Sequence, residues 1–270
     1  MTYKIVVCIK QVPDTSDIKW TKNNTIKREG LESVINPFDI GAIQLAKNAK
    51  QMLLKMDINS EINVVTMGPN QAVDALKTAI AMGCDNAYLL SDKKFAGADT
   101  LATAYTLSQF VKTYFPDFSL IICGQQAIDG DTAQTPSSMA EKLQIAQITN
   151  VYGIKDINNV YSVWFRETEN YKQEIKSGYP LLVATTNANI VIRPNINSYI
   201  KAQDSVIKIL SADDINADYD KIGLNGSPTQ VKKAFKPMNE RTTITLNSDS
   251  IDDCAEFIIN EITQCRSNNE

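Results

Sequence analysis

The chain has 270 residues, of which 43% are hydrophobic and 21% are charged, a composition typical of a globular protein. Its net charge is −4, and the lack of a basic surplus argues against a nucleic-acid partner. The chain contains no histidine, and its five cysteines are scattered with no C-x-x-C pair, so we expect neither a metal site nor a histidine-based nucleophile.

The chain begins with a short apolar segment, which we expect to be a strand and not a targeting sequence. Residues 4–10 form a continuous apolar run, which is typical of a parallel strand covered on both faces. That run is too short for a signal peptide, and no later run reaches the roughly 20 apolar residues that span a bilayer. We therefore expect a cytoplasmic protein with no membrane partner.

Strands and helices then alternate along the first half of the chain. The apolar pattern predicts strands at 4–10, 61–66, 87–90 and 120–123, and helices that begin after Asn36, Asn70 and Asp99 as N-cap residues. This alternation predicts an α/β fold, a parallel sheet with helices on both faces. Ligands of such sheets bind outside the carboxyl ends of the strands. We therefore expect the strand ends at Lys10, Gly68 and Gly124 to lie close together.

The pattern changes after about residue 145. Residues 151–157, 160–168 and 171–175 are predicted to form antiparallel strands, with turns at 158–159 and 169–170, and residues 180–185 a buried strand. Periodicity is weak beyond residue 190, until an amphipathic helix is predicted at 251–263. Residues 225–247 between them are expected to form an extended arm. These boundaries predict a domain at 1–190 with a hairpin extension at about 147–176, a segment at 191–224 and an arm with a helix at 225–270.

The loop from Gly124 to Thr135 is the candidate binding site. It follows a buried strand and opens a helix, whose N-terminus presents unpaired N–H groups and a partial positive charge that suit a phosphate. Gly124 and Gly130 would let the backbone approach a ligand, and Thr132 and Thr135 add hydroxyl groups. The same residues fit an ordinary strand-to-helix turn equally well. Neither a G-x-G-x-x-G nor a G-K-[ST] motif occurs, which argues against the usual dinucleotide fingerprint and a P-loop.

A second loop, residues 95–100, lies between a predicted strand and a predicted helix. Its local features favour a structural interpretation, with Gly97 forming the turn and Asp99 capping the following helix. The residues of this loop alone therefore predict no ligand.

Taken together, several segments resemble the β subunit of electron-transfer flavoprotein. The resemblance covers about residues 3–186 and resumes near 221–237. The segments that carry it are residues 7–14 (VCIKQVPD), 35–39 (INPFD), 67–69 (MGP), 79–85 (AIAMGCD), 124–135 (GQQAIDGDTAQT) and 226–231 (GSPTQV). The resemblance implies a Rossmann-like domain of the adenine-nucleotide-hydrolase-like type, in a heterodimer with an α subunit that carries the electron-transferring FAD.

The resemblance leaves two ligands open for the β site. In ordinary members this site holds AMP as a structural ligand, whereas in electron-bifurcating members it holds a second FAD that accepts a hydride from NADH. Residues 95–100 (FAGADT) and 126–134 (QAIDGDTAQ) resemble the bifurcating members. The resemblance therefore favours FAD, with NADH as a transient donor, electrons passing to the α-subunit FAD and to a partner dehydrogenase, and ferredoxin or flavodoxin as the low-potential acceptor.

The site residues follow from the matching positions. Cys8, Asn36 and Met67 would frame the adenosine, and Thr132, Ala133, Gln134 and Thr135 would contact the phosphates. The complete set implied by the resemblance is Cys8, Asn36, Met67, Ala98, Asp99, Thr100, Gly124, Gln126, Ala127, Ile128, Asp129, Gly130, Asp131, Thr132, Ala133, Gln134 and Thr135, with no residue that acts as a catalytic group.

One departure from the family concerns the partner proteins. The resemblance implies that residues 191–224 dock a flavin-dependent dehydrogenase and that residues 225–270 wrap the α subunit. The family's Glu-Pro-Arg segment and lysine run are absent after the last core strand, where this chain reads NANIVIRP from Asn187. An acyl-CoA dehydrogenase and a hydroxyacid dehydrogenase are therefore equally open as partners. A remote alternative is a nucleotide-binding regulator of the universal-stress type, although the glycine-rich loop of that group is absent.

Overall fold

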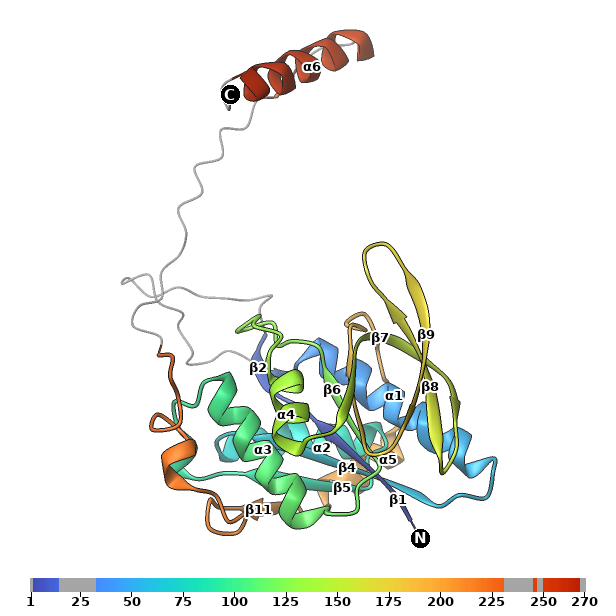
Figure 1. Ribbon diagram of the computed structural model, residues 1–270, viewed down its shortest axis with the longest axis vertical. Coiled ribbons are helices and arrows are strands. Elements are labelled where there is room, and N and C mark those ends of the chain that lie inside the picture. Colours follow the sequence, from blue (N-terminus) through green and yellow to red (C-terminus); the bar gives the residue numbers. More distant parts are fainter. Residues whose placement is uncertain (1, 15–32, 231–244, 247–249, 268–270) are drawn as a thin grey trace. The chain divides into compact units, whose positions relative to one another are not determined.

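The computed structural model describes residues 2–14, 33–230, 245–246 and 250–267. The chain divides into two compact units, residues 1–233 and residues 234–270. The first unit contains a large sheet with its helices, and the second contains one described helix, α6 (Figure 1).

The first unit is built on a nine-stranded sheet with the order β11-β5-β4-β1-β6-β10-β7-β8-β9, counted over the described residues. The strands up to β7 in this order are parallel to their neighbours, and the β7–β8 and β8–β9 pairs are antiparallel. The strands are β1 (Tyr3–Cys8), β4 (Ser60–Met67), β5 (Asn86–Leu90), β6 (Leu120–Gly124), β7 (Ala146–Ile157), β8 (Tyr161–Glu167), β9 (Lys172–Gly178), β10 (Leu181–Thr185) and β11 (Lys208–Leu210), with β2 (Gln11–Pro13) and β3 (Ser33–Ile35) pairing separately.

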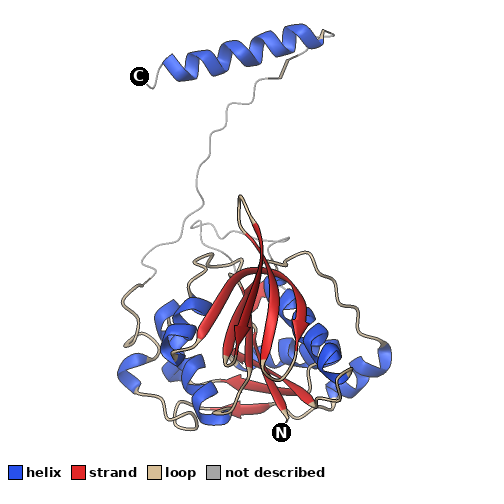
Figure 2. Ribbon diagram, turned by 45° about the vertical axis from the view of Figure 1, so that its right-hand side comes forward, coloured by secondary structure: helices blue, strands red, loops and turns tan. Residues whose placement is uncertain are grey.

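Helices lie on both sides of this sheet, as Figure 2 shows. Their bounds are α1 (Pro37–Leu54), α2 (Val73–Met82), α3 (Thr100–Tyr114), α4 (Thr135–Leu143) and α5 (Ile196–Gln203), with short 3-10 turns η2 (Asn70–Ala72), η3 (Lys93–Phe95) and η4 (Tyr219–Lys221). The predicted α/β class, with a parallel sheet, helices on both faces and an antiparallel extension, is confirmed.

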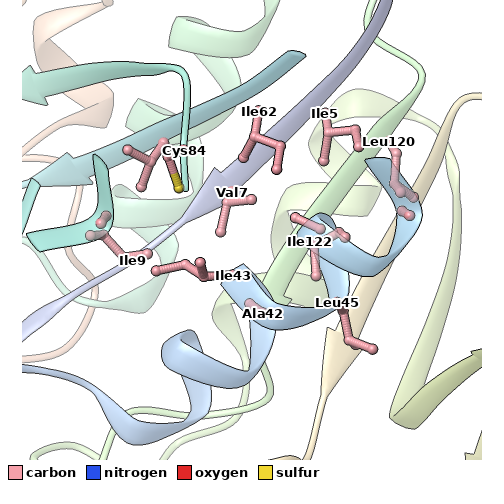
Figure 3. Close-up of a cluster of buried hydrophobic side chains, with 14 of the residues drawn as sticks. Ile5, Val7, Ile9, Ala42, Ile43, Leu45, Ile62, Cys84, Leu120 and Ile122 are labelled. Carbon is pink, nitrogen blue, oxygen red and sulfur yellow. The ribbon is translucent and has the colours of Figure 1, made fainter. Parts of the chain in front are cut away.

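Alternating residues of each strand enter the two cores. Ile5 and Val7 of β1 are fully buried on the side of α1 and α2, whereas Val6 is fully buried on the side of α3 and α4. Figure 3 shows Ala42 and Ile43 of α1 against the first of these faces. Because the strands are covered on both faces, they are continuously apolar, which is why their sequence pattern was readable.

The strand order places a topological switch point between β1 and β6. The chain runs from β1 through α1 to β4 and through α2 to β5, and then returns through α3 to β6 on the other side of β1. The crossover helices therefore change face at β1, and ligands of such sheets bind outside the carboxyl ends of the strands at a point of this kind.

The antiparallel extension has both of the predicted turns, although β7 begins at Ala146 rather than at residue 151 and β9 ends at Gly178 rather than at residue 175. Asn158 accepts hydrogen bonds from the backbone N–H groups of Val160 (2.8 Å) and Tyr161 (3.0 Å), which closes the predicted turn. At the second turn, Thr168 and Tyr171 exchange backbone hydrogen bonds around residues 169–170. The strands nevertheless do not form a separate sheet, because β7 pairs in parallel with β10.

Two sequence predictions differ from the structure. Asn70 does not cap α2: it begins η2, and α2 starts at Val73 with no side-chain cap, because the chain enters through the extended Pro69. The weakly periodic segment after residue 190 contains α5 and β11, which pack on α2 and pair with β5, respectively. These elements are short and partly apolar on their exposed side, so neither gives a clear period. Docking of a partner on residues 191–224 stays a prediction.

The second unit contains α6 (Ile251–Ser267), which confirms the predicted amphipathic helix at 251–263. The greater part of the predicted extended arm, residues 231–244 and 247–249, lies outside the described residues. Within the part of the chain that is described, no helix combines the length and apolarity needed to cross a membrane.

Candidate functional site

The predicted strand ends meet at the switch point. Cys8 pairs with Val65 of β4 on one side and with Cys123 of β6 on the other, so β1 lies between the two strands that end at Met67 and Gly124. The predicted proximity of these three ends is confirmed. Cys8 and Cys123 are buried, and the hydrogen bond between their side chains and their burial raise the pKa of Cys123 well above its usual value. The thiol of Cys123 is therefore protonated and unreactive.

Asn36 holds the first half of the loop from Gly124 to Thr135. Its side-chain amide donates to the carbonyl of Gln126 (2.8 Å), and its carbonyl oxygen accepts from the N–H of Ile128 (3.2 Å). Asn36 occupies the predicted N-cap position of α1, directly before Pro37, but its side chain makes no cap bond and is used on the loop instead. Asn36 is 1% exposed, and both of its bonds place residues 126–128 over the start of α1.

Asp39 is a site residue that the sequence analysis did not select. Its carboxylate accepts the backbone N–H of Lys10 (2.7 Å) on one oxygen and that of Gly124 (3.1 Å) on the other. One buried side chain of α1 therefore joins the ends of β1 and β6, the two strands that border the switch point. Burial raises the pKa of Asp39 to about 7, against the lowering effect of these hydrogen bonds. The signal for Asp39 was an acidic residue in the first turn of a helix, which is also common in ordinary helices.

Charged side chains close the base of the loop. The ammonium group of Lys10, just after β1, contacts the carboxylate of Asp129 at 2.7 Å, and Gln126 donates to Asp131 across the loop. Both partners of the ion pair are partly exposed, so the pair positions the loop more than it stabilises the fold.

The second half of the loop forms a cradle of unpaired N–H groups. Asp131 and Ala133 have positive φ angles of 51° and 52°, in the left-handed region that non-glycine residues seldom adopt. Gln134 follows in a right-handed conformation, and alternation of this kind turns successive N–H groups toward one point. Within the described chain, the N–H groups of residues 132–135 and 137 donate to no acceptor. We call residues 131–137 the phosphate cradle.

The N-terminus of α4 adds its own charge to the cradle. Gln134 occupies the N-cap position without a side-chain cap bond, and Pro136 has no N–H to be satisfied. The N-terminus of α3 differs, because Asp99 accepts from the N–H groups of Leu101 (2.9 Å) and Ala102 (3.1 Å). An anion would therefore find free donors at α4 and not at α3. The cradle fits a phosphate group in charge and in donor geometry.

Residues 95–100 lie beside the cradle. The hydroxyl of Thr100 donates to the side-chain oxygen of Gln134 (3.2 Å), which joins the two loops that the sequence analysis had singled out separately. Gly97 has φ = 74°, so the predicted turn and the predicted Asp99 cap are both confirmed. Both oxygens of the Asp99 carboxylate are engaged by the chain, since the second one accepts from Thr229.

The two glycines of the loop have different roles. A Cβ atom on Gly124 would lie 2.3 Å from a carboxylate oxygen of Asp39 and 2.7 Å from Cβ of Phe38, so only glycine fits between β6 and α1. A Cβ atom on Gly130 would meet nothing within 4 Å. Close packing within the chain therefore explains why residue 124 is glycine, but it does not explain why residue 130 is glycine.

The structure thus brings the predicted residues to one edge of the sheet. Cys8, Met67 and Gly124 lie at neighbouring strand ends, Asn36 binds the loop, and Thr100 connects residues 98–100 to Gln134. Among the described residues, no group of three or more acidic or cysteine side chains could hold a metal ion. The arrangement offers N–H donors and buried apolar walls, which suit binding of a nucleotide rather than acid–base chemistry.

Comparison with known proteins assigns the chain to a family. Residues 23–213 match the electron transfer flavoprotein domain. The electron transfer flavoprotein subunit beta of Megasphaera elsdenii is 38% identical over 268 residues, which cover 97% of each chain. The caffeyl-CoA reductase-Etf complex subunit CarD of Acetobacterium woodii is 36% identical over 265 residues, covering 97% of this chain and 98% of the relative. Protein FixA of Azorhizobium caulinodans is 37% identical over 266 residues, covering 96% and 93%. The chain therefore belongs to the family of electron transfer flavoprotein β subunits, together with FixA.

Proposed function

We propose that this chain is the β subunit of a heterodimeric electron transfer flavoprotein and that it binds FAD through the loop from Gly124 to Thr135. The observation that carries the nucleotide site is the phosphate cradle, in which several backbone N–H groups have no acceptor within the described chain. Strain at Asp131 and Ala133, on the order of 1–3 kcal/mol for each such residue, supports a binding role, because strained backbone is concentrated at ligand clamps.

The chain's own residues would bind, orient and enclose the nucleotide. Residues 132–135 would donate to its phosphates, and Cys8, Asn36 and Met67 would lie along the adenosine. Bound FAD would supply hydride acceptance from NADH and onward transfer of single electrons. Because the chain has no histidine, the proposal assigns no proton transfer to the protein.

FAD is favoured over AMP by the contact between the two loops. The Thr100–Gln134 hydrogen bond joins residues 98–100 to the cradle, so these residues are available to a ligand that is longer than AMP. The name of the relative CarD, a subunit of a caffeyl-CoA reductase-Etf complex, also supports a redox assembly. We extend the proposal to electron bifurcation, with the α-subunit FAD and a partner dehydrogenase as acceptors in one branch and ferredoxin or flavodoxin in the other.

Two exposed apolar surfaces support the proposed partners. On α6, Ile251, Ile258, Ile259 and Ile262 are each more than half exposed, as expected of a helix that packs on an α subunit. On α5, the side chains of Ile196, Tyr199 and Ile200 are also more than half exposed and lie three and four residues apart. We propose that this second face docks the flavin-dependent dehydrogenase, of the acyl-CoA or hydroxyacid type.

Identification of the bound ligands tests the proposed function directly. The chain is co-expressed with its α subunit, the complex is denatured, and the released cofactors are separated by chromatography. We expect two FAD per heterodimer. One FAD and one AMP would instead show a β subunit with a structural nucleotide, and ATP in a homodimer without flavin would show a nucleotide-binding regulator.

The hydroxyl groups of Thr132 and Thr135 provide a local test. Neither hydroxyl has a hydrogen-bond partner within the described chain, so replacing both threonines by valine removes contacts to the ligand and none within the fold. We expect about tenfold weaker nucleotide retention, as for the loss of one or two neutral hydrogen bonds, with an unchanged melting temperature. Thr78→Val on α2, which removes a hydroxyl bonded only to its own helix, is the matched control. Unchanged cofactor content in the double variant would refute the phosphate assignment.

A further inference from the structure

The last segment of the first unit packs on the loop before α3. A Cβ atom on Gly223 would lie 2.0 Å from the carbonyl oxygen of Lys94, and one on Gly97 would lie 2.6 Å from a methyl group of Leu224. Both glycines have positive φ angles, 53° and 74°, which makes glycine the favoured residue at each. We call residues 222–229 the root segment, because the chain continues from it toward the second unit.

Asp99 joins the root segment to α3. One oxygen of its carboxylate caps the helix, and the other accepts from the backbone N–H (3.1 Å) and the hydroxyl (2.8 Å) of Thr229. The backbone N–H of Asp99 donates to the hydroxyl of Ser227 (2.8 Å), which in turn donates to the carbonyl of Gly223 (2.6 Å). The side chain of Ser227 is buried, so this connection is well protected from water.

Thr100, the residue after Asp99, contacts the cradle instead of the root segment. The hydroxyl of Thr100 donates to the side chain of Gln134, whose backbone N–H belongs to the phosphate cradle. One peptide unit, Asp99–Thr100, therefore carries both the contact to the root segment and the contact to the cradle. These contacts connect positions 34 and 130 residues apart in the sequence.

The charge of Asp99 strengthens this connection. Burial raises the pKa of its carboxyl, but the hydrogen bonds from Ala102, Thr229 and Leu101 together lower it below the usual value. Asp99 is therefore ionised, and hydrogen bonds to an ionised acceptor are about twice as strong as those between neutral groups. Asp99 acts as a positioning residue for Thr229 and for the start of α3.

We propose that Asp99 and Thr100 couple occupation of the phosphate cradle to placement of the root segment, so that nucleotide binding and α-subunit binding strengthen each other. This inference rests on the proposed function and adds a regulation to the same site. A bound phosphate fixes residues 132–135, Gln134 then holds Thr100, and the Asp99 carboxylate holds Thr229 at the start of the arm. Linkage requires that the effect be reciprocal, so the α subunit must raise the affinity of the chain for the nucleotide by the same factor.

The test measures this coupling in the full-length chain. The affinity of the chain for its FAD-loaded α subunit is determined with the chain stripped of nucleotide, and again with AMP or FAD added as the probe. For the wild type we expect either nucleotide to tighten α-subunit binding by about fivefold or more, the usual lower range of coupling between sites. The melting temperature of each chain is recorded alongside.

Two variants weaken the connection without touching the cradle. Thr229→Val deletes the hydroxyl bond to Asp99 at an exposed position and leaves the helix cap intact, and Ser227→Ala deletes the buried contact. We expect either variant to bind AMP within about twofold of the wild type, but to lose most of the coupling. Thr113→Val is the matched control, because its hydroxyl bonds the carbonyl of Ile215 from the other end of α3.

The outcomes separate this proposal from the proposed function. Coupling that is lost in Thr229→Val and kept in Thr113→Val, at unchanged melting temperature, supports the connection. Coupling of wild-type size in Thr229→Val, or an equal loss of coupling in Thr229→Val and in the control Thr113→Val, overturns it while the nucleotide site stands. Failure of the wild-type complex to bind any nucleotide overturns the proposed function, and the coupling with it.

Discussion

Replacing Asp39 by asparagine is expected to cause the largest loss of stability of any conservative change at the site. The carboxylate uses a different oxygen for each backbone N–H, from Lys10 and from Gly124, and asparagine has only one oxygen to offer. One buried N–H would then face an amide NH₂ group. An unsatisfied buried donor costs roughly 1–3 kcal/mol, and the opposed donor adds to it, so we expect a loss of about 3 kcal/mol.

Urea unfolding monitored by circular dichroism measures this loss as a shift of the midpoint at constant slope. Asp117→Asn is the matched control, because Asp117 pairs with Lys4 at a partly exposed position where ion pairs contribute about 0–1 kcal/mol. An Asp39 variant as stable as the Asp117 variant would show that the link between the ends of β1 and β6 is dispensable. Nucleotide retention should fall in the Asp39 variant alone.

The stability difference between wild type and Asp39→Asn is also expected to depend on pH. Burial raises the pKa of Asp39 to about 7 in the native state, from 3.8 as the ordinary value. Between these two values, the native state therefore holds a proton that the unfolded state has lost. The contribution of this proton to the free energy of unfolding is fully present below pH 3.8 and is lost as the pH rises to about 7. Between pH 5 and 7 the difference should decrease by on the order of 1 kcal/mol per pH unit. A difference that grows with pH would contradict the raised pKa.

Replacing Gly124 by alanine is expected to distort the loop and release the nucleotide. The added methyl would overlap the carboxylate of Asp39 and the backbone of Phe38, at 2.3 and 2.9 Å, and backbone atoms cannot rotate away. Overpacking of this kind costs about 1–3 kcal/mol. Moving the start of α1 away from β6 would also break the bonds of Asn36 and Asp39 to the loop, so we expect nucleotide content to fall to a small fraction of that in wild type.

Gly130→Ala separates the effect of the fold from that of the ligand. The new methyl would enter open space, and its φ angle is not in the left-handed region, so stability should be unchanged or slightly higher. If Gly130→Ala keeps its stability but loses nucleotide, the ligand itself lies against Gly130, as the family resemblance implies. Wild-type stability and cofactor content in Gly124→Ala would contradict the packing described for that residue.

The elements that the sequence predicted are those whose signals are local. Residues 120–123 are apolar because β6 is covered on both faces, and Asp99 caps the helix that follows it within three residues. The turn at 158–159 is likewise closed by bonds within its own segment. In each case the partner groups lie close in the sequence, so spacing and residue type suffice.

The errors concern side chains whose partners lie far away in the sequence. Asn36 has the residue type of an N-cap, but its amide binds residues 90 and 92 positions later, which no local pattern indicates. Asp39 was passed over because a carboxylate in the first turn of a helix is ordinary, and its contact with Gly124 spans 85 residues. The start of the candidate loop was predictable as a strand end, whereas the side chains that hold it were not.

The position of β6 between β1 and β10 has a consequence for the order in which a newly synthesised chain acquires this site. The strand that bears the loop, β6, lies between β1 and β10. β1 is at the start of the chain, whereas β10 ends only at Thr185. A nascent chain that has just exposed residue 135 has the whole loop but lacks one neighbour of its supporting strand. Because such distant contacts form late, the ability to hold a nucleotide should appear only after β10 has left the ribosome. Nucleotide capture would then mark the point at which β6 has both of its neighbours, before the C-terminal helix is made.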